Sequence, residues 1–361
     1  MDSLDMDSRA NAELRDESAT TDNSTAGTKF WIAMGAFWFI FCMVVWGAWI
    51  TGPDFKPNHI GVAQASPGYI TLIRSLDVIS VLAAATQLWF FVLRPKLRTG
   101  RFSFDALFFL SCWMLYIQEP WLDYNSDQFL YTTVDYNMGS WCRYIPGWNS
   151  PNAELIPVGS LIWCLAYLNL VAIWGYVGSK LMGWMKRRWP ALAPWQLVCL
   201  CFLAFIPADL ILELSIVYLQ LFNYASTVPA LTIFAGKTYQ FPLYETASWC
   251  ATLTALSCIH YFRNAHGEAL PERNLRLLNL SPGTKTICRF LGILGMCQVW
   301  FFLTYNVPYF YWSTKGGAYP PYAAYKIAGV CGPGTNYDCP GLTIPVPKAL
   351  SPTNHMALPA N

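Results

Sequence analysis

The sequence predicts an all-α fold, a polytopic membrane bundle of about seven transmembrane helices with a structured outer loop. Hydrophobic residues make up 55% of the 361 residues and charged residues only 12%, a composition far from that of a soluble domain. The apolar residues also gather in seven long stretches. These stretches are residues 30–51, 70–93, 104–118, 155–182, 196–222, 241–262 and 286–305.

Most of these stretches approach or exceed the roughly 20 residues that a helix needs to cross the hydrocarbon of a bilayer. The third is short unless it continues through Glu119. Residues 29–315 are expected to form one helical domain, since no internal repeat or long linker divides them. Residues 1–28 are acidic and rich in Ser and Thr, which predicts a disordered cytosolic tail. Residues 316–361 are expected to be a non-cytosolic, Gly/Pro-rich tail.

Basic residues predict the orientation of the bundle. They gather in the second, fourth and sixth loops, whereas the odd-numbered loops carry little more than Lys56, Arg143 and Lys237. Cytosolic loops of membrane proteins are enriched in Lys and Arg, so the even-numbered loops and the N-terminus are expected in the cytosol. The chain is thus predicted to be a multi-pass integral membrane protein. The basic loop residues are Arg94, Lys96, Arg98, Arg101, Lys186, Arg187, Arg188, Arg263, Arg273, Arg276 and Lys285.

Four acidic residues in the outer half of the bundle are the candidate catalytic residues, because a charge in a membrane is costly unless it is paired or lines a polar cavity. Asp209 and Glu213 are four residues apart and share a helix face. Repulsion between two such acids favours one protonated acid beside one ionised acid. Glu245 begins the sixth stretch, and Glu119 follows the third. The competing interpretations are structural hydrogen bonding for the pair and helix capping for Glu119.

Further polar and aromatic residues form a candidate substrate-binding set. Arg74 and Asp77 lie three residues apart on one helix face, where a structural ion pair is the competing interpretation. Residues 120–152 are too aromatic for a disordered loop, so a cap folded onto the bundle is expected. Its tryptophans have an alternative place in the interfacial aromatic belt. The complete set is Arg74, Asp77, Asp123, Asn137, Trp141, Trp148, Tyr244 and Asn306.

Several kinds of chemistry lack their motifs in this sequence. The four histidines are not clustered, and no Gly-rich phosphate loop, GxSxG elbow or CxxC pair occurs, so no metal or cofactor is expected. The formal net charge of +2 gives no reason to expect nucleic acid as a partner. Acids and aromatic side chains suit protonation, dehydration or cyclisation of a lipophilic small molecule. Membrane lipids are the other expected partners, and the sequence does not indicate the oligomeric state.

Two cysteines stand apart from the others. Cys331 and Cys339 lie in the segment CGPGTNYDC, a Gly/Pro-rich loop of the tail that is predicted to be non-cytosolic. A disulfide persists in such a compartment. The sequence leaves two interpretations open here, a disulfide and a pair of free thiols.

Four segments resemble the recurring blocks of a known family. They are NMGSW at 137–141, IPGWNSPN at 145–152, YQFPLYE at 239–245 and CGPGTNYDCP at 331–340. Together they are similar to the AveC-like spirocyclases, with the helices between them in the same order from about residue 69 to 340. The resemblance implies an integral membrane enzyme that dehydrates a polyketide and closes a spiroketal. It supplies no catalytic residue set, so the roles of the four acids rest on their physical chemistry.

Two other functions fit parts of the pattern. A membrane cyclase acting on a terpenoid or meroterpenoid could use the same acids to protonate an epoxide or an alkene. A transporter or lipid-binding protein could use the charged pairs for gating, but no inverted repeat or matched helix interruption is found in the sequence.

Overall fold

The structure, a computed structural model, describes residues 3–125, 129–148, 151–332, 334–339 and 348–349. A helical segment occupies each of the seven apolar stretches, so the predicted all-α bundle is confirmed. Three of the seven are continuous rods in which α-helices join through π-helical turns. The helices are α1 (Ser3–Ile50), α2 (Pro67–Gln87), α3 (Arg94–Thr99), α4 (Phe104–Trp113), α5 (Leu161–Ala166), α6 (Ile173–Arg188), α7 (Pro194–Tyr218), α8 (Leu243–Tyr261), α9 (Pro282–Phe301), α10 (Val307–Ser313) and α11 (Ala324–Ile327).

Five of these helical segments are long and apolar enough to cross a membrane. The segment 104–118, which is α4 and a 3-10 turn (Met114–Gln118), is apolar but shorter. Helix α8 has 19 residues and carries a carboxylate in its first turn. The count of seven membrane spans therefore stays a prediction. The five are Thr25–Ile50, Pro67–Thr99, Leu161–Arg188, Pro194–Tyr218 and Pro282–Ser313.

Helix α1 is longer than the first apolar stretch. It begins at Ser3 and so includes the polar segment for which the sequence predicts disorder. Near the point where the apolar part begins, the hydroxyl of Thr28 donates to the carbonyl oxygen of Arg273 at 2.5 Å. This contact ties α1 to the loop that precedes α9.

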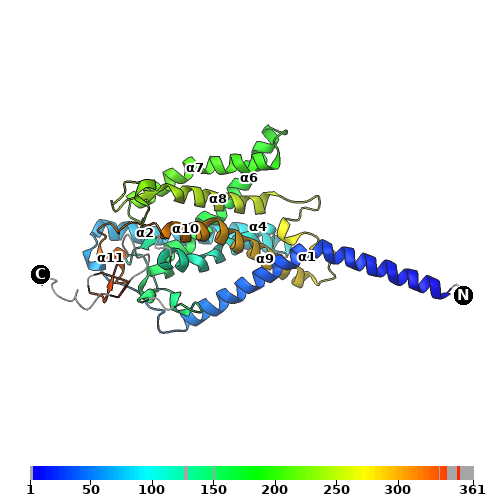
Figure 1. Cartoon of the computed structure of the whole chain (residues 1–361), viewed down its shortest axis with the longest axis horizontal. Helices are drawn as coiled ribbons and strands as arrows, with labels where there is room; N and C mark the ends of the chain where they lie inside the picture. Colours follow the sequence, from blue (N-terminus) through cyan, green and yellow to red (C-terminus); the bar gives the residue numbers. More distant parts are fainter. Residues whose placement is uncertain (1–2, 126–128, 149–150, 333, 340–347, 350–361) are drawn as a thin grey trace.

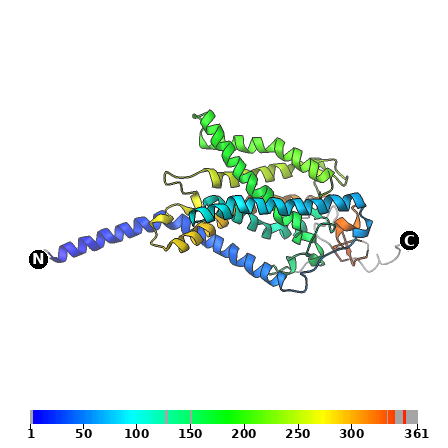
Figure 2. The ribbon, with the colours of Figure 1, turned by 180° about the vertical axis from the view of Figure 1, so that it is seen from behind.

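The rods run roughly along one axis, so the loops gather at two ends of the bundle (Figure 1). The basic loops between α3 and α4, α6 and α7, and α8 and α9 lie at the end where α1 projects, which we call the N-terminal end; Figure 2 shows the same grouping from behind. The opposite end, which we call the cap end, carries α11 and the segment 120–152. Which of the two ends faces the cytosol stays a prediction.

Glycines allow the closest helix contact in the bundle, between α1 and α9. A Cβ atom at Gly35 would lie 1.8 Å from the carbonyl oxygen of Leu291, and one at Gly295 would lie 2.3 Å from that of Trp31. Only a residue without a side chain permits this approach, and small residues serve the same purpose in membrane helix pairs. Helix α8 packs between α6 and α7 on one side and α9 on the other.

Short antiparallel strand pairs close the cap end. Strand β1 (Phe129–Tyr131) pairs with β2 (Phe222–Tyr224), which follows α7, in the register Phe129 to Tyr224. Strand β3 (Thr232–Ile233) pairs with β4 (Phe241–Pro242) immediately before α8. A third pair joins β5 (Tyr337–Asp338) to β6 (Lys348–Ala349) in the C-terminal segment. The first pair holds Tyr131 and Tyr224 beside the helix ends, and the second pair fixes the loop that precedes α8.

Candidate active site

The cap, residues 120–152, is built around one buried asparagine. The side-chain oxygen of Asn137 accepts from the backbone N–H groups of Asn58 and Gly139, at 3.0 and 3.2 Å. Its amide nitrogen donates to the carbonyl oxygens of Asn58, Thr133 and Asp135, at 3.1, 3.3 and 3.0 Å. All polar atoms of this predicted substrate-binding side chain are thus occupied in joining the cap to the α1–α2 loop.

The two predicted cap tryptophans lie against the bundle. Trp141 is buried, its ring lies 5.3 Å from those of both Trp49 and Tyr116, and its N–H donates to the carbonyl oxygen of Ile117. It lines an apolar cavity of about 460 Å³ between α1 and α4. Trp148 is partly buried against the same core. Positive φ angles at Gly139 and Gly147 produce the turns beside these two rings.

Glu119 is buried beneath the cap, within the third helical segment, which continues through this residue into a π-helical turn (Trp121–Asn125). Its two carboxyl oxygens accept hydrogen bonds from two tyrosines that are distant from each other in sequence. The hydroxyl of Tyr131, from β1, donates to Oε1, and that of Tyr167 donates to Oε2 at 2.5 Å. The carboxyl group is therefore held between the cap and the rod of α5 and α6.

Glu245, in the first turn of α8, is bound by two tyrosines as Glu119 is. Its Oε1 accepts from the hydroxyl of Tyr305 at 2.7 Å, and its Oε2 accepts from that of Tyr309. These two tyrosines are four residues apart, across the junction of a π-helical turn (Phe302–Asn306) and α10. Glu245 also lies within electrostatic range of Glu119, so the two carboxyl groups belong to one region.

Asp209 and Glu213 face the same region from α7. Both are buried, and Glu213 lies within electrostatic range of Asp209 and Glu245. The hydroxyl of Tyr224, from β2, donates to Glu213 at 3.1 Å. Asp209 accepts no well-formed hydrogen bond from the described residues, although the Thr246 hydroxyl lies beside it. The structure thus brings the four predicted catalytic acids together.

We call the four acids and their tyrosines the acid layer. It comprises Glu119, Asp209, Glu213, Glu245, Tyr131, Tyr167, Tyr224, Tyr305 and Tyr309. Sequence reasoning missed these tyrosines as site residues because they come from two strands, two π-helical turns and α10, far apart in sequence. One signal was available: Tyr305 and Tyr309 have the spacing that places them on one helix face. π-helical turns often occur at functional sites, and two of them hold Tyr167 and Tyr305 here.

Amide side chains connect the acid layer's helices in a chain of hydrogen bonds. Asn306 donates to the side-chain oxygen of Gln118 at 2.9 Å, and Gln118 donates to that of Gln298 at 2.6 Å. All three side chains are buried. This chain fixes the π-helical turn that carries Tyr305 against the segment that carries Glu119, so Asn306 acts here through its neighbours.

Asp123 lies one turn beyond Glu119, in the cap. It is buried, and neither carboxyl oxygen accepts a hydrogen bond from any residue that the structure describes. Burial, together with the negative charge of Glu119, raises the pKa of Asp123 well above its usual range. A small cavity beside it is lined by Tyr131 and by the buried Lys326.

The remaining predicted site residues are Arg74, Asp77 and Tyr244. Arg74 and Asp77 form an ion pair at 3.3 Å, and Asp77 interacts with Asp135 of the cap, whose pKa is raised by burial and by that contact. The ring of Tyr244 stacks on that of Trp312, and its hydroxyl accepts from the N–H of Val228. The ion pair thus joins α2 to the cap, while Tyr244 sits next to Glu245 in sequence.

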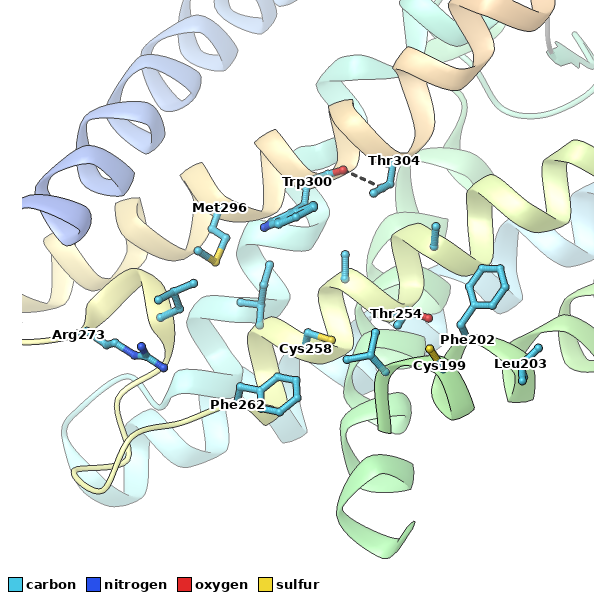
Figure 3. A pocket seen from close by; sticks show the side chains of 15 residues that line it. Cys199, Phe202, Leu203, Thr254, Cys258, Phe262, Arg273, Met296, Trp300 and Thr304 are labelled. Carbon is cyan, nitrogen blue, oxygen red and sulfur yellow. Dashed lines mark hydrogen bonds between the residues drawn. The ribbon is translucent and has the colours of Figure 1, made fainter. Parts of the chain in front are cut away.

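An apolar groove of about 820 Å³ lies between α7, α8 and α9 on the N-terminal side of the acid layer. Figure 3 shows Phe202 and Leu203 facing Trp300 and Thr304 across it. Thr304 directly precedes Tyr305, and its hydroxyl lies 2.8 Å from that of Thr252. Leu203 precedes Asp209 by six residues, which is roughly 9 Å along a helix axis. The groove therefore ends close to the acids.

The structure adds two observations on metal and disulfide chemistry. Among the described residues, no three His, Cys, Asp or Glu side chains are grouped so that they could hold a metal ion. Cys331 and Cys339 are joined by a disulfide in the segment that follows α11.

Comparison with known proteins gives one match. The sequence profile of the family described as Spirocyclase AveC-like matches residues 99–324, which is more than half of the chain and includes all four acids. The ion pair of Arg74 and Asp77 and the disulfide segment lie outside the matched residues. No curated protein and no solved structure matches the chain. The chain therefore belongs to the AveC-like spirocyclase family.

Proposed function

We propose that the chain is a membrane-embedded cyclase and dehydratase of secondary metabolism that closes a spiroketal on a lipophilic polyketide by general acid–base catalysis. The observation that carries this proposal is the acid layer, in which four buried carboxyl groups meet five tyrosine hydroxyls in a largely apolar surrounding. Membership of the family suggests cyclase chemistry, and the arrangement of the acids suggests how the chain performs it.

The reaction requires an acid, a base and protection from water. A hemiketal hydroxyl takes a proton from a carboxylic acid. Its C–O bond then breaks and water departs, so the substrate becomes an oxocarbenium ion. A second hydroxyl of the substrate then attacks the cationic carbon, a new C–O bond forms, and the released proton passes to a carboxylate. One molecule of water is lost, and no oxidant or reductant is consumed. Positioned acids and bases typically accelerate such proton transfers by about 10²–10⁴-fold.

Glu213 is best placed to carry the proton. It lies within electrostatic range of both Asp209 and Glu245, so protonation at this position relieves repulsion with both of them. Glu245 is best placed as the carboxylate that stabilises the cation and accepts the proton, because two tyrosine hydroxyls donate to it. Asp209, which accepts no well-formed hydrogen bond from the described residues, can exchange a proton with Glu213. The rings of Tyr305 and Tyr309 add aromatic surface beside the cation.

The apolar groove gives the substrate a route to these acids. Its walls are almost entirely carbon, and exposed apolar residues such as Leu203 and Trp300 lie at its edge. A polyketide dissolved in the hydrocarbon could enter between α7 and α9 without crossing water. Trp249, whose ring lies 5.0 Å from that of Tyr305, would then contact the substrate as it reaches the acid layer.

The test compares metabolites and then enzyme variants. A strain lacking the gene should accumulate an acyclic or hemiketal precursor that is heavier than the parent's product by one water. Membranes containing the full chain should convert this precursor, and membranes with Glu213→Gln at matched protein levels should not. Accumulation of a linear terpenoid instead would support the alternative cyclase, and an unchanged metabolite profile would overturn the enzymatic proposal.

A further inference from the structure

A cavity lined by charged and polar side chains lies at the N-terminal end of the bundle, remote from the acid layer. It has a volume of about 370 Å³, within the usual range for small-ligand sites. Residues of α6, the start of α4, the end of α8 and the segment that follows α8 form its walls. They are Asp105, Ser179, Lys180, Gly183, Arg187, His260, Tyr261 and Arg263.

Three cations line this cavity, and none of them lies within ion-pair distance of a described carboxylate. Neither Lys180, Arg187 nor Arg263 has an ion pair within 4 Å among the described residues. Other cations at the same end are paired: Arg276 contacts Glu268 at 3.6 Å, and Arg289 contacts Glu272 at 2.7 Å. The three positive charges around one concave surface therefore attract an anion.

The one acid in the cavity wall is already bound. Oδ1 of Asp105 lies 2.9 Å from Nε2 of His260, and this imidazole is 6% exposed. The rings of Phe104, Phe108 and Tyr176 surround the imidazole at 5.2–5.4 Å between centroids, which fixes its orientation. Asp105 is thus held at the side of the cavity by His260, from where its charge also acts on Lys180 and Arg263. Arg263 donates to the carbonyl oxygens of His260 and Gly267, so Lys180, Arg187 and the remaining N–H groups of Arg263 are left for a ligand.

A glycine leaves the space open. A Cβ atom at Gly183 would meet Nη1 of Arg187 at 3.5 Å and the ring of Tyr261 at 3.7 Å. The guanidinium group therefore extends over Gly183 toward α8. Any larger side chain at this position would project into the space that a ligand needs.

The surface beside the cavity is apolar. Val177, Lys180, Trp184 and Arg187 have the i, i+3, i+7 and i+10 spacing of one face of α6, and Val177 and Trp184 are 46% and 52% exposed. Cations thus alternate with large exposed apolar residues along this face. Such a face suits a molecule with an anionic head and a hydrocarbon tail, and basic pockets between membrane helices bind lipid head groups in this way.

We propose that this cavity binds the phosphate group of an anionic amphiphile, with Lys180, Arg187 and Arg263 on the phosphate oxygens. A phosphate here comes either from a membrane lipid head group or from a soluble phosphate compound. The guanidinium group of Arg187 offers paired donors to phosphate oxygens, Arg263 adds the N–H groups that His260 and Gly267 do not use, and Lys180 adds a point charge. The site is independent of the acid layer and of the proposed cyclase reaction.

Native mass spectrometry of the full chain in detergent tests this proposal, with dioleoyl phosphatidic acid and dioleoyl phosphatidylcholine as probes. The wild type should bind phosphatidic acid at least tenfold more tightly than phosphatidylcholine. The double variant K180Q/R187Q should lose this preference. Arg188→Gln is the matched control, because Arg188 lies on the same helix with its guanidinium over Trp189, outside the cavity. It should change the affinity for phosphatidic acid by less than twofold.

A second variant separates the cavity from charge alone. Gly183→Leu keeps all three cations and fills the space, so it should also weaken phosphatidic acid binding at least tenfold. Inorganic phosphate identifies the source: stabilisation of the wild type by millimolar phosphate, absent in Gly183→Leu, would support a soluble ligand if the lipid preference is lacking. Equal binding of both lipids together with no effect of phosphate would overturn the proposal. Full affinity in Gly183→Leu, or an equal loss in Arg188→Gln, would do the same.

Discussion

Asn137 in the cap and the two α7 acids of the acid layer are all buried, yet their polar groups are satisfied in opposite ways. In the cap, Asn137 exchanges five hydrogen bonds with the backbone, all between 3.0 and 3.3 Å. In the acid layer, Asp209 accepts no well-formed hydrogen bond from the described residues, and Glu213 accepts one from Tyr224. Complete pairing fixes one conformation, whereas incomplete pairing leaves a carboxyl group free to gain or lose a proton.

This difference has an energetic meaning. A buried amide whose partners are all present stabilises the fold, and its loss leaves several backbone groups without partners. A buried carboxyl group with few or no donors destabilises the fold, so a chain that retains Asp209 and Glu213 has another use for them. We therefore expect the cap to determine how much folded protein there is and the acid layer to determine what the folded protein does.

The largest effect should follow from Glu213→Gln. The amide keeps the shape of the side chain but cannot deliver a proton, so turnover of the accumulated precursor should fall about 100-fold or more. Asp209→Asn should lower turnover by a comparable factor if the two acids exchange a proton. Glu154→Gln removes a carboxylate near Arg143 in the cap and is the matched control, for which we expect wild-type turnover. Wild-type activity in both Glu213→Gln and Asp209→Asn would end the assignment.

The second effect falls on stability. Asn137→Ala removes the acceptor for the N–H groups of Asn58 and Gly139, and each unsatisfied buried group costs about 1–3 kcal/mol. We expect a loss of roughly 3 kcal/mol or more, measured as a lower thermal midpoint in detergent, with turnover per folded molecule unchanged. Reduced turnover in the folded fraction would instead give Asn137 the substrate-binding role that its sequence position suggested.

Comparison of these regions also shows what sequence can predict. Long apolar stretches locate the helical segments because burial in lipid or protein imposes one composition over many residues. The acids were recognisable for the same reason, since Asp209 and Glu213 interrupt such a stretch. Their partners were not, because Tyr131 and Tyr224 reach the acids only through the pairing of two three-residue strands. The structural use of Asn137 was hidden likewise, since its partners at Asn58 are 79 residues away.

A third effect concerns a single hydroxyl. Tyr309→Phe removes one of the two tyrosine donors to Glu245 and should lower turnover about tenfold, the usual range for one hydrogen bond to a charged group. Tyr311→Phe is the matched control, since this side chain is 55% exposed and two residues away. Turnover is compared per folded molecule, because the loss of a donor to the buried Glu245 also lowers stability. An equal loss of turnover in the two variants would argue against a specific role for the Tyr309 hydroxyl.

The smallest effect tests Asp123, which lies in the cap by sequence but has unsatisfied carboxyl oxygens like those of Asp209. Its pKa is raised in the folded protein, so the folded state binds more protons than the unfolded state above the unfolded pKa of about 4. Stability should therefore fall as the pH rises from that value through the folded pKa. Asp123→Asn removes this dependence and should stabilise the protein at pH 7.5 by roughly 1 kcal/mol, the low end for an unsatisfied buried group.

Thermal midpoints of wild type and Asp123→Asn between pH 4 and 8 measure this difference, and turnover measured in parallel assigns the residue. A gain in stability with unchanged turnover would show that Asp123 destabilises the cap next to Glu119 and takes no part in turnover. The same gain with a large loss of turnover would add Asp123 to the acid layer, because only a group that exchanges protons with the substrate or its neighbours would explain why the chain keeps a destabilising carboxylate there. A midpoint difference that does not vary with pH would show that Asp123 titrates alike in the folded and unfolded states.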